Sequence, residues 1–122
     1  MVAISIELPW PAKELHPNGR SHYMAKAREA KKARSNAHKS ALAAGIRLGD
    51  FDIPQALRVT VTFMPKTRNA FDLDNALAAL KSSLDGIADA IGVDDSKWQI
   101  ALRKEEPVKG GLVRIELERV NG

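Results

Sequence analysis

The sequence contains no cysteine, few aromatic residues and no long apolar run. The absence of cysteine excludes disulfides, thiolate metal ligands and cysteine nucleophiles, and it fits a reducing compartment. Aromatic residues make up 5% of the chain, so aliphatic side chains must supply most of the core. No apolar run approaches the about 20 residues that a membrane-spanning helix needs. The first residues also lack the basic and apolar regions of a secretory signal. We therefore expect a cytoplasmic protein with no membrane partner.

A chain of 122 residues, 44% of them hydrophobic, is long enough for one globular domain with a modest core. Its formal charge is +4 at pH 7. A positive balance indicates a polyanionic partner once the cations are found to cluster. The sequence has no internal repeat and no linker, and we expect residues 1–122 to form a single domain.

Four stretches alternate apolar with polar residues, which is the pattern of half-buried strands, namely 2–8, 57–63, 98–103 and 113–118. Between them lie two helical stretches, one from the expected N-cap Ser21 to about Ala44 and one that ends before Gly92. The order β-α-β-α-β-β predicts an α/β domain with a mixed sheet and helices packed on it. Turn-forming residues between the last two strands favour a hairpin-like connection and antiparallel pairing, namely Pro107 and Gly110-Gly111.

The first helix carries much of the positive charge. It has one acid, Glu29, against six cations: Lys26, Arg28, Lys31, Lys32, Arg34 and Lys39. Its apolar face is thin, because it consists of alanines helped by Met24 and Leu42. Like charges at i,i+4 repel by a few tenths of a kcal/mol, so an anionic partner is indicated. The alternative is an ordinary solvated surface helix.

The second helix is flanked by carboxylates, Asp72 and Asp74 before it and Asp94 and Asp95 after it. Its apolar residues recur in steps of three and four, so one face should pack on the core: Leu77, Leu80, Leu84, Ile87 and Ile91. Carboxylates gathered in one site repel each other, and a bound Mg²⁺ removes that conflict while leaving positions for phosphate oxygens. A shared site requires the chain after Gly92 to fold back. Alternatively, the acids only cap the helix and form a turn.

A polar stripe runs beside the apolar face of this helix, formed by Asp74, Ala78, Lys81 and Asp85. From this stripe Lys81 can reach toward the helix N-terminus. A lysine close to a phosphate would stabilise developing negative charge. The alternative is an ion pair between Lys81 and Asp85 at i+4.

These residues resemble the RusA-type endodeoxyribonucleases, small Holliday junction resolvases often encoded by phages and prophages. The similarity covers most of the chain and rests on four motifs, Asn18-Gly19-Arg20, Asp72-Leu73-Asp74-Asn75, Leu84-Asp85-Gly86 and Asp94-Asp95-Ser96. The resemblance implies a homodimer that binds four-way DNA junctions and cleaves paired strands with Mg²⁺. The catalytic aspartates of the family match Asp72, Asp74 and Asp95. The family lysine that follows the second aspartate by four residues is replaced here by Ala78, and Lys81 is the candidate substitute.

The resulting hypothesis is phosphodiester hydrolysis in branched DNA, in recombination or repair. Asp72, Asp74 and Asp95 would hold Mg²⁺, or Mn²⁺ in its place, and Lys81 would assist electrostatically. Six cations are the expected contacts to the DNA phosphates, namely Arg20, Lys26, Arg28, Lys32, Lys66 and Arg68. Two alternatives remain. One is a junction-binding protein that has lost catalysis, as Ala78 suggests, and the other is a small structural protein whose acids serve only as caps.

Overall fold

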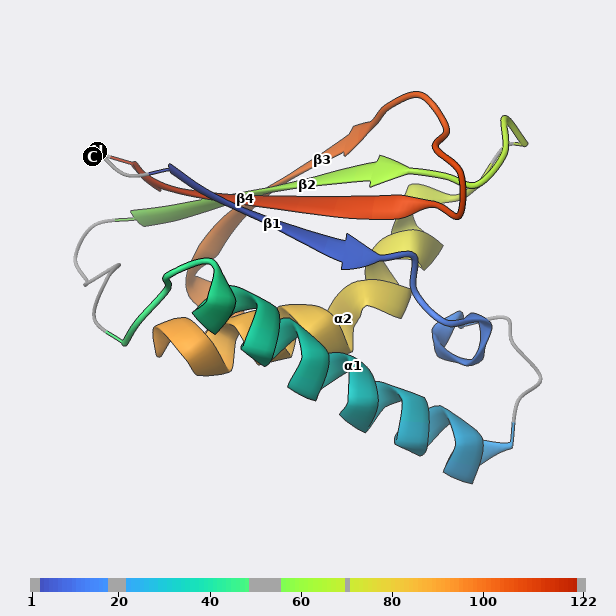
Figure 1. Cartoon of the computed structure of the whole chain (residues 1–122), viewed down its shortest axis with the longest axis horizontal. Helices are drawn as coiled ribbons and strands as arrows, with labels where there is room; N and C mark the ends of the chain where they lie inside the picture. Colours follow the sequence, from blue (N-terminus) through green and yellow to red (C-terminus); the bar gives the residue numbers. More distant parts are fainter. Residues whose placement is uncertain (1–2, 18–21, 49–55, 70, 121–122) are drawn as a thin grey trace.

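The computed structural model describes residues 3–17, 22–48, 56–69 and 71–120. Their elements follow in the order β1 (Ala3–Pro9), η1 (Lys13–Leu15), α1 (Tyr23–Ala43), β2 (Ala56–Met64), α2 (Leu73–Ile91), η2 (Asp95–Lys97), β3 (Trp98–Lys104) and β4 (Leu112–Val120). The strands form one four-stranded sheet, and both long helices cover the same face of it (Figure 1). The chain is therefore a single α/β domain with a mixed sheet. This confirms the order of elements predicted from the alternation pattern.

The strand order in the sheet is β1-β4-β2-β3. β4 pairs antiparallel with both β1 and β2, and β2 pairs parallel with β3. The predicted hairpin between β3 and β4 is therefore wrong, because β2 lies between these two strands. The loop that joins them crosses the end of β2. There the Glu105 N–H donates to the Phe63 carbonyl at 3.0 Å, and the Val108 N–H donates to the Pro65 carbonyl at 3.0 Å.

The core lies between the sheet and the two helices. On α2 the predicted apolar stripe is buried, with Leu80, Leu84, Ile87 and Ile91 each at most 2% exposed, whereas Leu77 packs at its edge. They meet residues of β2 and β4 such as Val59, Val61, Ile115 and Leu117, all of which are 0% exposed. Each fully buried Leu or Ile stabilises the fold by about 1.5–3 kcal/mol, so this stripe fixes α2 to the sheet.

Helix α1 begins later than the sequence predicted. Its N-cap is His22, whose Nδ1 accepts a hydrogen bond from the Met24 N–H at 3.2 Å, and the predicted N-cap Ser21 lies outside the described residues. Met24 is 56% exposed and Leu42 is 38% exposed. The prediction that these two side chains help to cover the core is therefore wrong, and Ala37 and Ala41 are the residues of α1 that are buried.

The two helices approach each other backbone to backbone at Gly86. A Cβ on Gly86 of α2 would lie 2.1 Å from the carbonyl oxygen of Arg34 on α1, far inside van der Waals contact. Because small residues face each other here, α1 approaches α2 closely although it buries little apolar area. Neither α1 nor α2 is long and apolar enough to cross a membrane.

Candidate active site

The first acidic pair stands at the N-terminus of α2, just after the chain leaves β2. Asp72 is the N-cap of the helix, and its Oδ1 accepts hydrogen bonds from the N–H groups of Asp74 at 2.8 Å and Asn75 at 3.4 Å. This capping role is the one that acids favour at helix N-termini. Asp74 lies in the first turn and is exposed. Its carboxylate makes no hydrogen bond or ion pair within the described part of the chain.

An aromatic cluster holds the segment that leads into this pair. The Phe71 ring packs edge to face against Trp10, with 5.5 Å between ring centroids, and against Phe63 at 6.2 Å. The Lys104 ammonium lies 4.6 Å from the centroid of the Phe71 ring, which is within the range of a cation–π contact. These contacts join the entrance of α2 to β2, to β3 and to the end of β1.

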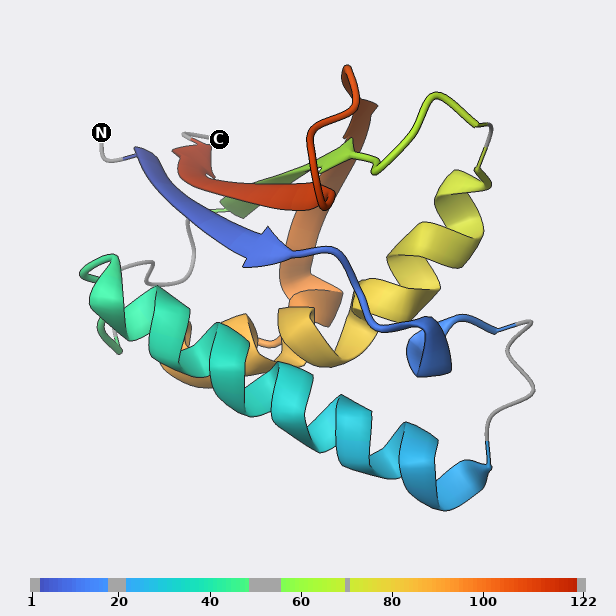
Figure 2. The same ribbon diagram turned by 45° about the vertical axis from the view of Figure 1, so that its right-hand side comes forward.

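The second acidic pair follows a sharp reversal at the other end of α2. Gly92 has φ 79°, a left-handed conformation that glycine adopts without a Cβ clash, and its N–H donates to the Ala88 carbonyl at 2.8 Å. Asp94 then caps η2. The Ser96 hydroxyl and the Ser96 N–H both donate to its carboxylate and hold the pKa of Asp94 below its usual range. The chain thus turns back beside α2 before entering β3 (Figure 2).

This return places Asp95 against the middle of α2. The Lys81 ammonium donates to Asp85 Oδ1 at 2.7 Å and also contacts Oδ2 of Asp95, which lies 14 positions after the lysine. One lysine therefore joins Asp85 of the helix to Asp95 of η2. The hydrogen bond to Asp85, and then the one to Asp95, raise the pKa of Lys81. Lys81 is therefore a fixed cation rather than a group ready to give up its proton. Its side chain points to Asp85 and Asp95, and the predicted reach toward the helix N-terminus is wrong.

A further ion pair continues the polar stripe of α2. Arg34 of α1 forms a bidentate ion pair with Asp89, in which Nε donates to Oδ2 at 2.7 Å and Nη2 donates to Oδ1 at 2.8 Å. The hydrogen bonds from Arg34 lower the pKa of Asp89. The hydrogen bonds to Asp89, and in addition the negative charge of Asp85, raise the pKa of Arg34. Acids and cations therefore alternate along this side of α2 and tie α1, α2 and η2 together.

The three aspartates offered as metal ligands do not form one ligand set within a single chain. Among the described residues, no group of three or more His, Asp or Glu side chains is placed to hold a metal ion. Asp74 and Lys81 are seven residues apart, or about 10 Å along the helix axis at 1.5 Å per residue. The donor chemistry nevertheless suits Mg²⁺, which prefers carboxylate oxygens. The Asp74 carboxylate has no partner among the described residues, whereas the Asp72 carboxylate caps α2 and the Asp95 carboxylate binds Lys81.

The predicted DNA contacts differ in how far the fold already satisfies them. Lys26, Arg28 and Lys66 are exposed and form no ion pair within residues 3–17, 22–48, 56–69 and 71–120. Lys32 pairs with Glu29 at 3.5 Å, and Arg68 pairs with Glu106 at 2.8 Å on a fully solvated loop. Arg20 lies outside the described residues.

Sequence reasoning missed the ion pair between Arg34 and Asp89 and gave the contact between Lys81 and Asp85 only as an alternative. Asp85 was considered only as an alternative partner for Lys81, yet it bridges through that lysine to Asp95. The contact between Arg34 and Asp89 carries no signal in the sequence, because the two residues are 55 positions apart on different helices. Only the i,i+4 spacing of Lys81 and Asp85 could have been found in advance.

An uncharacterized protein of Xylella fastidiosa is similar to this chain, with 40% identity over 94 residues, which is 77% of this chain. The aligned part spans 61% of the length of that relative. No family model matches the chain.

Proposed function

We propose that the chain is a Mg²⁺-dependent, structure-selective endodeoxyribonuclease of the RusA type, a cytoplasmic homodimer that resolves four-way DNA junctions. The observation that carries the proposal is the return of the chain after Gly92, which brings Asp95 to the stripe of α2 that holds Asp74, Lys81 and Asp85. Acids distant in sequence thereby gather along one helix, beside exposed cations suited to an anionic substrate.

In this proposal Mg²⁺ would be held by the carboxylates of Asp72, Asp74 and Asp95, which would have to come together on binding because they form no ligand set among the described residues of this structure. The bound ion would supply an activated water and stabilise the charge of the attacked phosphate. The Asp74 side chain is exposed and its carboxylate makes no hydrogen bond with a described residue, so it is the carboxylate best able to meet the substrate. Lys81 keeps its charge and adds positive potential next to Asp95. Lys26, Arg28 and Lys66 bind DNA phosphates.

The test is cleavage of a synthetic four-way junction in Mg²⁺, in Mn²⁺ and in EDTA. The wild-type chain should nick paired strands only with metal. Asp74→Asn should lower the rate by at least about 100-fold, the scale of losing one charged or hydrogen-bonding group from a preorganised site. Glu116→Gln is the matched control, because Glu116 is exposed on β4 and forms no ion pair within the described residues. Equal cleavage by wild type and Asp74→Asn would refute the site.

A second function, junction binding without cleavage, is favoured by a specific observation. Asp72 already caps α2, and Lys81 is already shared by Asp85 and Asp95. Such a protein would bind the junction tightly and leave it intact in Mg²⁺ and Mn²⁺. Asp74→Asn would then strengthen binding slightly, because it removes a negative charge facing the phosphates.

A further inference from the structure

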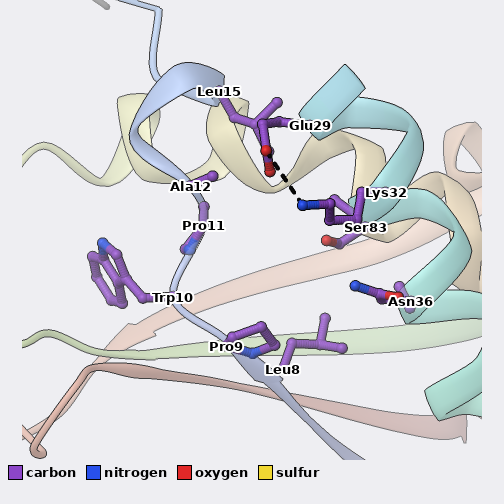
Figure 3. Close-up of a pocket in the computed structure, with 12 residues that line it drawn as sticks. Leu8, Pro9, Trp10, Pro11, Ala12, Leu15, Glu29, Lys32, Asn36 and Ser83 are labelled. Carbon is purple, nitrogen blue, oxygen red and sulfur yellow. Dashed lines mark hydrogen bonds and ion pairs between the residues drawn. The ribbon is translucent and has the colours of Figure 1, made fainter. Parts of the chain in front are cut away.

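A cavity of about 160 Å³ opens between the end of β1, η1 and the two helices (Figure 3). Leu8, Leu15 and Ala37 form its buried apolar floor, and the segment from Pro9 to Ala12 forms one wall. The Trp10 ring turns away from it to pack against Phe63 and Phe71. The cavity is about as large as an engineered cavity of 150 Å³ that binds benzene, so it can accept one aromatic ring.

Polar groups line the opposite wall of this cavity. The Asn36 amide and the Ser83 hydroxyl point toward it (Figure 3), and neither makes a hydrogen bond to any residue that the structure describes. Glu29 stands at its rim, bound to Lys32 at 3.5 Å. A mostly apolar cavity with a few converging polar groups is the usual form of a small-molecule site.

The charge around the rim suits a nucleotide. Glu29 and Lys32 of α1 line the cavity, and Lys26 lies seven residues before Ala33 of the lining, on the same side of the helix. Lys26 has no ion-pair partner in the described part of the chain, and Lys32 is 63% exposed beyond its contact with Glu29. Lys32 therefore lines a cavity that has the size of one ring and carries amide, hydroxyl and carboxylate groups for its edge, and Lys26 lies about two turns before Ala33 on the same side of α1.

We infer that this cavity binds one unpaired single-ring nucleobase, a pyrimidine, with its phosphate held by Lys26 and Lys32. Asn36, Ser83 and Glu29 would meet the donors and acceptors at the edge of the base, as side chains do for splayed-out bases. The inference rests on the proposed function for the source of the base, an unstacked nucleotide of the branched DNA. It adds a recognition site that is separate from Asp72, Asp74 and Asp95.

The direct test uses the whole chain and free nucleotides. Titration with deoxycytidine or thymidine 5′-monophosphate, followed by NMR, should shift the side-chain amide signal of Asn36 and the backbone signal of Ser83. Deoxyguanosine 5′-monophosphate should shift them less, because its two-ring base exceeds the cavity. Absence of shifts at both residues with either pyrimidine nucleotide would overturn the inference, and so would equal binding of the purine nucleotide.

The second test uses a filled cavity. Ala33 is half-buried in the lining, so Ala33→Phe should occupy the space, whereas Ala27→Phe on the exposed part of the same helix is the matched control. Ala33→Phe should weaken junction binding about 10-fold, within the range that one stacked base contributes. An abasic site in place of the bound nucleotide should weaken the wild type equally and the variant no further.

The two proposals can fail separately. Unchanged junction affinity of Ala33→Phe in a protein that still cleaves would overturn the cavity site and leave the nuclease intact. Shifts at Asn36 and Ser83 in a protein that neither binds nor cleaves junctions would support the cavity site and remove the nuclease.

Discussion

The carboxylates along α2 differ in their partners, and each partner decides what the carboxylate can do. Asp72 serves the helix N-terminus, Asp85 and Asp95 share Lys81, and Asp89 is held by Arg34. In this series, only the carboxylate of Asp74 makes no hydrogen bond or ion pair with a described residue. The acids that look alike in sequence are therefore unequal, and Asp74 is the one on which the proposed chemistry depends most.

The pair between Arg34 and Asp89 predicts an acid-sensitive contribution to stability. Hydrogen bonds from Arg34 lower the pKa of Asp89 in the folded state below the unfolded value of about 3.9. The contribution is thus complete above that value and is lost as the pH falls through the folded-state pKa. Asp89→Asn should lower the melting temperature at pH 7, and the gap to wild type should close as the pH falls below the unfolded value of about 3.9 and through the folded-state pKa. Thermal melts across this range measure it.

Glu116→Gln removes an exposed carboxylate without a pair in the described chain, and it should follow the wild-type curve at every pH. A gap for Asp89→Asn that keeps its size at pH 2 would show that the asparagine disturbs packing rather than the ion pair.

At the scale of elements, the contact between α1 and α2 depends on Gly86. The alanines of α1 bury little area, so the close approach at Arg34 is what allows the helices to meet and Arg34 to reach Asp89. A glycine inside a helix normally costs about 1 kcal/mol relative to alanine. Its presence here is explained by the 2.1 Å that a Cβ would leave to the Arg34 carbonyl oxygen.

We therefore expect Gly86→Ala to change the stability of the fold in the direction opposite to the one that helix propensity predicts. Propensity alone predicts stabilisation by about 0.5–1 kcal/mol, whereas overpacking predicts destabilisation by about 1–3 kcal/mol. We expect the second result in urea denaturation, with an unchanged m-value. Ala78→Gly on the exposed stripe of the same helix is the control and should cost about 1 kcal/mol by propensity alone. A neutral or stabilising Gly86→Ala would contradict the close contact.

The periodicity of the sequence was enough to predict the elements but not their neighbours. Alternation located all four strands, and the steps of three and four gave the buried face of α2. The pairing of β3 with β4 was wrong, because glycine and proline mark a reversal without saying which strand lies beside which. The loop from Glu105 donates hydrogen bonds to Phe63 of β2 and to Pro65 just after this strand, a tertiary contact that no local pattern encodes.

For the whole molecule, the candidate site was predictable by residue type and only partly by place. The acids and Lys81 followed from sequence, and the need for the chain to return after Gly92 was recognised. The end point of that return was not predictable, because it depends on where β3 joins β2 in the sheet. In the structure Asp95 contacts Lys81, which lies seven residues after Asp74 on α2. The acids therefore stand in two groups and do not form one ligand set among the described residues.

The distribution of cations over the molecule predicts how DNA binding depends on salt. Lys26 and Arg28 are exposed on α1 and form no ion pair within the described residues, so both are available to phosphates. Each phosphate contact contributes about 0.9 to the slope of log affinity against log salt concentration. Lys26→Ala and Arg28→Ala should therefore each lower the slope for a four-way junction by about 0.9 and weaken binding most at low salt.

The control for this series lies on the other face of the sheet. Arg58 alternates with the buried Leu57 and Val59 and pairs with Glu118 of β4 at 3.4 Å, so it points away from both helices. If DNA binds along α1, Arg58→Ala should leave the salt slope unchanged, because no counterion is released at a residue that the DNA does not touch. Equal loss of slope in Arg58→Ala and Lys26→Ala would mean that only the overall charge attracts DNA. That result would refute α1 as the DNA-binding face. If DNA binds at one face, only the cations of that face contact phosphates, and replacing a cation on the opposite face should have no effect on the slope.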